Sequence, residues 1–149
     1  MNLKEQLFKA CKDFVNKRLQ TVEEIISSNQ KALQSETKSS AGDKHETGRA
    51  MLQLEMEKAG QQLLGIQQMK EVLAKIEVSK ISKVAHLGSI VYTQKTTYFL
   101  SISVGKIVHN NTSFFAISLQ SPIGLLLLGK QENNTFFFNG EQLKIIKIL

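Results

Sequence analysis

The sequence has no tryptophan, one proline and one cysteine in 149 residues. Because Cys11 is alone, no disulfide can form within the chain, and its place in an apolar helical stripe predicts a buried thiol rather than a nucleophile. No apolar run approaches the ~20 residues that a membrane-spanning helix needs, and residues 1–6 lack the pattern of a signal peptide. We therefore expect a cytoplasmic protein that has no membrane partner.

Residue patterns that carry catalytic chemistry are also scarce. The three histidines are scattered, the single cysteine excludes a thiolate cluster, and the nine glycines do not form a phosphate-binding loop. A catalytic triad of Ser, His and Asp cannot be identified from sequence spacing, because its members come together only in the folded structure. We do not expect the chain to be an enzyme by itself.

Charge is unevenly distributed along the chain, which carries +6 overall. Residues 1–78 hold 12 Lys and Arg against 11 Asp and Glu, a net of +1, and residues 79–149 hold 7 against 2, a net of +5. A basic C-terminal part can bind DNA or another nucleic acid, or an acidic protein, or it can serve solubility alone.

Apolar residues recur every three or four positions in two long segments, about 3–38 and 44–77, and each pattern predicts a helix. The short polar stretch between them, residues 39–43, suits a tight connection. Residues that face each other in an antiparallel hairpin have a constant sum of numbers, and the two stripes match at 85, which pairs Ile26 with Ala59 and puts Asn29 in the seam. We expect a helical hairpin, or coiled coil, over residues 1–78.

From residue 79 onward, short runs rich in β-branched and aromatic residues predict strands over 88–93, 97–104, 114–117, 135–138 and 143–148. Ser121-Pro122, a short apolar run and then Gly129 predict a short helix. Asn139-Gly140 predicts a hairpin between the last two strands. The fold class is therefore α+β, with a helical hairpin over 1–78 and an antiparallel β domain with one short helix over 79–149.

Asp43 and Glu46 lie near the tip of the hairpin and have two interpretations. An Asp followed three residues later by a Glu at a helix start is a capping box, which contributes about 1 kcal/mol. Alternatively, two carboxylates at the end of a long rod can complete a divalent-metal site on another molecule.

Several motifs resemble the bacterial Gre transcript-cleavage factors of RNA polymerase. The tip, Gly42-Asp43-Lys44-His45-Glu46, looks like the Gly-Asp-x-x-Glu tip of that family. In the second domain, similarity in order and spacing extends through Gly88-Ser89-Ile90-Val91, Tyr98, Ile117-Ser118, Ser121-Pro122-Ile123-Gly124, Leu127-Leu128-Gly129-Lys130 and Asn139-Gly140. Together these motifs cover nearly the whole chain.

The resemblance implies an FKBP-like C-terminal domain that docks on RNA polymerase, and a hairpin inserted in the secondary channel of that enzyme. Asp43 and Glu46 would hold Mg²⁺ jointly with the polymerase, stimulate cleavage of backtracked RNA and meet the nascent transcript only indirectly. Partner-binding residues would be Arg49, Ser121, Pro122, Ile123 and Lys130. The factor would be a transcription elongation factor, accessory rather than enzymatic, and a monomer.

The tip departs from the family pattern directly after Glu46. Where the family usually continues Asn-Ala-Glu-Tyr, this chain has Thr47-Gly48-Arg49-Ala50, which replaces a carboxylate with a cation. A secondary-channel protein that modulates or inhibits the polymerase without cleavage is therefore an open alternative. A structural coiled-coil protein with an unrelated partner is another.

Overall fold

The computed structural model describes the backbone of residues 2–38 and 42–149 and the side chains of residues 2–35 and 46–149. The chain divides into two compact units. Unit 1 combines Met1–Phe14 with Glu71–Leu149, and unit 2 is the intervening segment Val15–Lys70.

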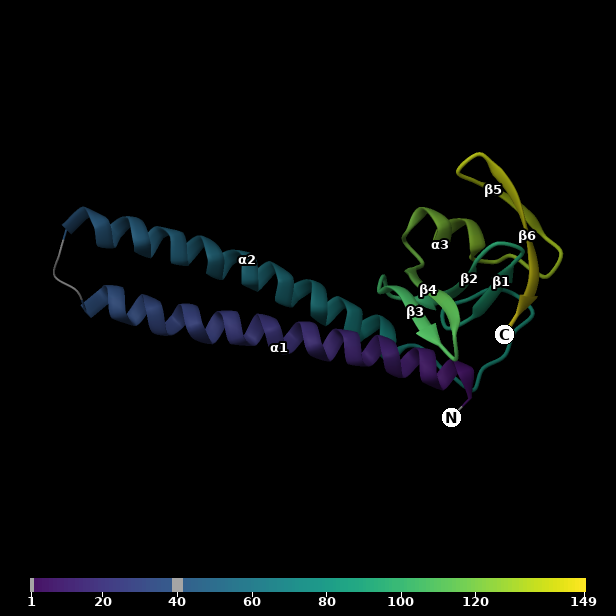
Figure 1. Ribbon diagram of the computed structural model, residues 1–149, viewed down its shortest axis with the longest axis horizontal. Helices are drawn as coiled ribbons and strands as arrows, with labels where there is room; N and C mark the ends of the chain where they lie inside the picture. The colour runs from purple at the N-terminus through teal and green to yellow at the C-terminus, as the bar shows by residue number, and fades with distance from the viewer. Residues whose placement is uncertain (1, 39–41) are drawn as a thin grey trace. The chain divides into compact units, whose positions relative to one another are not determined.

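Unit 2 consists of the greater part of two long helices, which form a hairpin, as predicted (Figure 1). Helix α1 spans Leu3–Lys38 and helix α2 spans Gly42–Ala74. No glycine or proline interrupts α1, so its propensity is uniformly compatible with a helix. The narrow apolar stripes of the two helices supply the buried side chains of the seam, which include Val22, Ala59 and Ile66. Within residues 2–38 and 42–149, no helix is both long enough and apolar enough to cross a membrane.

Unit 1 is built around a six-stranded sheet with the order β3-β4-β2-β1-β6-β5. The strands are β1 Ile90–Thr93, β2 Thr97–Ser101, β3 Gly105–His109, β4 Thr112–Ser118, β5 Thr135–Phe138 and β6 Glu141–Ile148. The short helix α3, Pro122–Leu127, follows β4 (Figure 1). Together with the hairpin, this sheet and its short helix make the chain an α+β protein, as predicted.

The sheet is mixed, whereas the sequence predicted an antiparallel one. Strand β4 pairs in parallel with β2, with Tyr98 opposite Phe115 and Leu100 opposite Ile117. The cause is β3, a strand absent from the prediction, which pairs with β4 on the far side from β2. The chain therefore skips one strand position after β2, and β4 fills the gap. Local patterns do not distinguish this path from a simple meander.

Two hairpin turns use asparagine or glycine in the left-handed region. Asn139 and Gly140 have φ values of 52° and 78° and join β5 to β6, which confirms the predicted hairpin. Asn110 and Asn111, at 49° and 62°, join β3 to β4 in the same way. Positive φ at both central residues matches the right-handed twist of the flanking strands.

Both faces of the central strands are covered. On one face, buried residues of the sheet and of the segment before β1 pack with α3 in a single core: Ala85, Val91, Tyr98, Leu100, Ile123, Leu127, Phe136, Leu143, Ile145 and Ile148. On the other face, Cys11 of α1 is buried, as predicted, with its Sγ 3.5 Å from the Oγ of Ser101. Lys4 Nζ donates a 2.6 Å hydrogen bond to the carbonyl oxygen of Lys80. The first turns of α1 thus belong to the core of unit 1.

Candidate functional site

The hairpin tip places the predicted carboxylates at the start of α2. The helix begins at Gly42, so Asp43 lies in its first turn and Glu46 follows three residues later. The side chain of Glu46 is exposed, and so is that of Arg49 one turn further on. Negative charge at a helix N-terminus is favourable because it complements the helix dipole. The side chain of Asp43 falls outside the described side chains, so the capping box stays a prediction.

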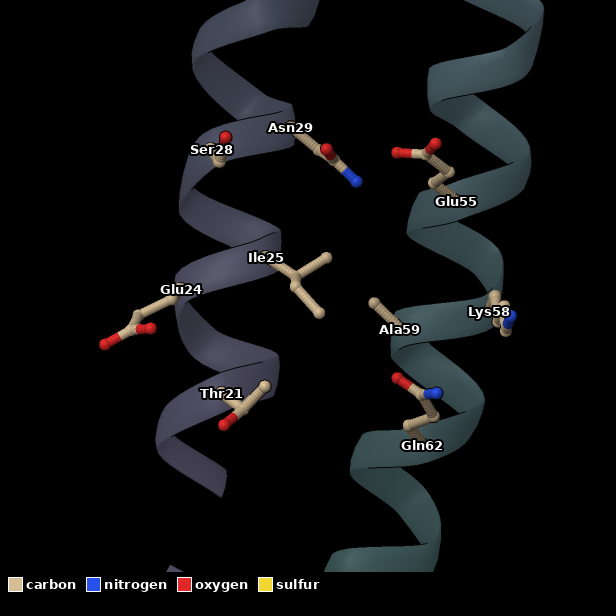
Figure 2. A pocket seen from close by; sticks show the side chains of 9 residues that line it. All are labelled: Thr21, Glu24, Ile25, Ser28, Asn29, Glu55, Lys58, Ala59 and Gln62. Carbon is tan, nitrogen blue, oxygen red and sulfur yellow. The ribbon is translucent and has the colours of Figure 1, made fainter. Parts of the chain in front are cut away.

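An open groove of about 530 Å³ runs between α1 and α2 within unit 2. Figure 2 shows Ile25 pointing across it toward Ala59 and Asn29 pointing toward α2 near Glu55. Ile26, the partner predicted for Ala59, is partly buried. The lining is Thr21, Glu24, Ile25, Ser28, Asn29, Glu55, Lys58, Ala59 and Gln62. Its mixed polarity makes the groove a poor match for an apolar ligand.

Asn29 is the polar residue that the stripes placed in the seam, and the structure confirms that it is buried, at 7% exposed. Its amide nitrogen Nδ2 has no hydrogen-bond acceptor among the described residues. A buried donor without a partner is costly, and a polar residue in a helical seam is a known device for fixing register. We therefore expect Asn29 to lower the stability of the hairpin, and a role in fixing its register stays a prediction.

The Ser121-Pro122-Ile123-Gly124 motif builds the start of α3. Ser121 Oγ donates to the Ser118 carbonyl oxygen at 2.6 Å and accepts from the Gly124 N–H at 3.1 Å, so it caps the helix. Pro122 occupies the first helical turn, where its missing N–H costs nothing. A Cβ at Gly124 would overlap the Ser118 carbonyl oxygen, so the close approach of helix and strand requires glycine.

Of the docking residues predicted from sequence, Pro122 is exposed, Ser121 and Lys130 are half-buried, and Ile123 is buried in the core. Ile123 therefore holds α3 against the sheet. The Lys130 backbone joins the loop before β1, because its carbonyl oxygen accepts a 2.8 Å hydrogen bond from the Ala85 N–H. The structure thus brings these four residues together at α3.

Two exposed apolar residues of α3 were missed by sequence reasoning. Leu125 is 63% exposed and the C-cap Leu128 is 45% exposed, while Leu127 between them is fully buried. The signal was present in the run of four leucines, since a short helix that packs one side on a sheet must present the others to solvent. Leu125, Leu128 and Pro122 form an exposed apolar surface, which we call the α3 surface.

The Gly88-Ser89 motif has a structural role. Gly88 has φ of 94°, and a Cβ there would lie 3.1 Å from Ile76 Cγ2. Ser89 is fully buried, its Oγ accepts from the His86 N–H at 3.0 Å, and it lies 2.8 Å from His86 Nδ1. The motif thus anchors the start of β1 and offers no exposed nucleophile at Ser89.

The sites form two groups in different units: Asp43, Glu46 and Arg49 in unit 2, and the residues around α3 in unit 1. Comparisons with protein-family models and with curated protein sequences find no match for the chain. The residues themselves, with their placement and exposure, are therefore the basis for assigning a function.

Proposed function

We propose that this chain is a Gre-type accessory factor of RNA polymerase, which acts in the cytoplasm. The observation that carries the proposal is the position of Asp43 and Glu46 in the first turns of α2, directly after the hairpin connection. A hairpin of two helices is too thin to enclose a substrate, so its tip is suited to completing a site on a larger molecule. The Gly-Asp-x-x-Glu pattern of the tip supports the same role.

Carboxylate oxygens are the hard ligands that Mg²⁺ prefers, and the exposed Glu46 fits such a role. A Mg²⁺ held jointly with the polymerase would stabilise charge on the oxygens of the phosphodiester that is cut. Glu46 and Asp43 would supply part of its ligand set and orient it, and the polymerase would supply the rest. The tip of the free protein is therefore a half-site, and Asp43 and Glu46 meet the nascent RNA only through the polymerase.

Docking is assigned to unit 1, in which we propose an FKBP-like arrangement of the sheet and α3. The α3 surface offers exposed leucines on a helix that is fixed by the Ser121 cap and by the close packing of Gly124. Exposed apolar side chains on a rigid element are typical of a protein-binding surface. Lys130 lies beside it and can meet an acidic residue of the polymerase.

The test is cleavage of RNA in a backtracked elongation complex. We expect Asp43→Asn or Glu46→Gln to abolish stimulated cleavage while polymerase binding is retained, because neither position lies in the α3 surface. Glu55→Gln, an exposed acid further along α2, is the matched control and should cleave normally. Raising Mg²⁺ should partly restore a single variant, since mass action refills a weakened site. Full activity of both tip variants would contradict the proposal.

A second function is favoured by Arg49, which is exposed three residues after Glu46. A cation at this spacing can pair with the carboxylate and compete with a metal. The chain would then occupy the secondary channel and modulate or inhibit the polymerase without cutting RNA. Binding without cleavage by the unmodified protein, together with a gain of cleavage in Arg49→Glu, would select this alternative.

A further inference from the structure

One half of the sheet has a face that is exposed and that no other described residue of unit 1 covers. In β5 and β6, Phe136, Leu143 and Ile145 are buried in the core, so the intervening residues point to the opposite side. Phe137 is 68% exposed there, opposite Gln142, and the exposed Lys144 is opposite Thr135. A solvent-facing phenylalanine on a strand is thus flanked by polar and cationic neighbours.

A β-bulge extends this face toward β1. Tyr92 pairs with Lys147 but Thr93 pairs with Ile145, so Ile146 is the additional residue. Ile146 is 56% exposed, and Lys147 next to it is exposed and has its Nζ 5.9 Å from the centre of the Tyr92 ring. We call Tyr92, Phe137, Gln142, Lys144, Ile146 and Lys147 the open face.

The open face carries positive charge. Glu141 is the one acidic residue in the sequences of β1, β5 and β6. It lies 2.8 Å from the Lys95 ammonium, and this hydrogen bond raises the pKa of Lys95. The other acid of residues 79–149, Glu132, accepts from the Ile148 N–H at 3.3 Å. Lys144 and Lys147 therefore set the sign of the field over the open face.

We propose that the open face binds single-stranded RNA. Phe137 and Tyr92 lie on the strands either side of β6, which are about 10 Å apart across the sheet. Phe137 pairs with Gln142 and Tyr92 with Lys147, five residues further along β6, so the two rings lie on a diagonal path that one RNA strand can follow. Phe137 is exposed and Tyr92 is half-buried. Aromatic rings on the surface of a sheet stack on unpaired bases, and lysines between them bind phosphates. The Gln142 amide beside Phe137 can bond the ribose 2′-hydroxyl, which favours RNA over DNA.

Binding is measured by fluorescence anisotropy with the full-length protein and a labelled, unstructured oligouridylate of about 12 nucleotides. We expect Phe137→Leu to weaken binding by at least about fivefold, since this change keeps an apolar side chain and removes the stacking ring. Phe115→Leu, at a 37% exposed phenylalanine on β4, is the matched control and should bind normally.

The contribution of the lysines is measured separately, by the salt dependence of the RNA affinity. Lys144→Gln and Lys147→Gln should each weaken binding and reduce the slope of log affinity against log salt by about 0.7. Lys106→Gln on β3, at the opposite edge of the sheet, changes the net charge equally and should leave the slope unchanged. All of these side chains are exposed, and unchanged far-UV circular dichroism will show that the variants are folded.

Because the chain lacks tryptophan, tyrosine fluorescence reports directly on the open face. Of the two tyrosines, Tyr98 is buried at 8% exposed, so quenching by a stacked base should be lost in Tyr92→Phe. Equal affinity for deoxyuridylate, displacement of RNA by polyglutamate, or insensitivity to Phe137→Leu would each overturn the proposal. The assay contains no polymerase, so a failure here leaves polymerase docking and cleavage untouched.

Discussion

Replacement of Asn29 with leucine should stabilise the hairpin. Asn29 is 7% exposed, and its Nδ2 has no acceptor among the described residues. A buried, unpaired donor costs about 1–3 kcal/mol, and leucine of similar length removes that cost. Leucine also has the higher helix propensity, which adds about 0.5 kcal/mol. We therefore expect the free energy of unfolding to rise by about 1.5–3.5 kcal/mol.

The propensity contribution can be removed by a matched control. Asn16 lies in the same helix and is exposed, so Asn16→Leu should gain only the ~0.5 kcal/mol of propensity. Urea unfolding followed by the helical far-UV circular dichroism signal gives both values. If Asn29→Leu gains no more than Asn16→Leu, the amide is satisfied and the reasoning is wrong. A higher oligomer in Asn29→Leu, by light scattering, would instead show that Asn29 specifies the state of the seam.

Two further predictions concern close packing at Gly124 and burial of the Cys11 thiol. Gly124→Ala should destabilise the chain by at least about 2 kcal/mol, because the added Cβ would overlap the Ser118 carbonyl oxygen. Gly65→Ala is the control: Gly65 of α2 has open space at the Cβ position, so this change should stabilise the chain by about 0.5–1 kcal/mol. Thermal unfolding of the two variants compares these effects. Burial raises the pKa of the Cys11 thiol, and the Ser101 hydrogen bond opposes this in part. A raised folded-state pKa contributes stability that is present below about pH 8.5 and lost at higher pH. Above that pH, the free energy of unfolding measured in urea should therefore fall more for the wild type than for Cys11→Ser. Equal pH profiles of the two proteins would contradict this prediction.

Much of the fold could be predicted because its signals are local. The stripes of the hairpin, the Ser121-Pro122 start of α3 and the Asn139-Gly140 turn each depend on residues close in sequence. The position of β4 between β2 and β3 could not, since strand order is decided by pairing between distant segments. β3 was missed because its Gly105-Lys106 start is exposed and carries no apolar alternation.

The sites divide in the same way. The spacing of Asp43 and Glu46 is visible in the sequence, and so is the motif that holds α3. The open face is not, because Tyr92 and Phe137 are far apart in sequence and become neighbours of β6 only through the sheet order. Ile123 was predicted to contact a partner, yet its side chain is 7% exposed, which only the packing of α3 could reveal.

Unit 1 is interrupted in sequence by unit 2, and this order matters on the ribosome. Leu7 and Cys11 are synthesised first, but the sheet that buries them is complete only after β6. At about 5–20 residues per second, they wait at least several seconds for their partners. The hairpin can close during this interval because its contacts are complete once residue 70 has emerged. The first turns of α1 therefore keep their apolar side chains exposed on the nascent chain until the sheet is complete, and we expect a chaperone to bind there.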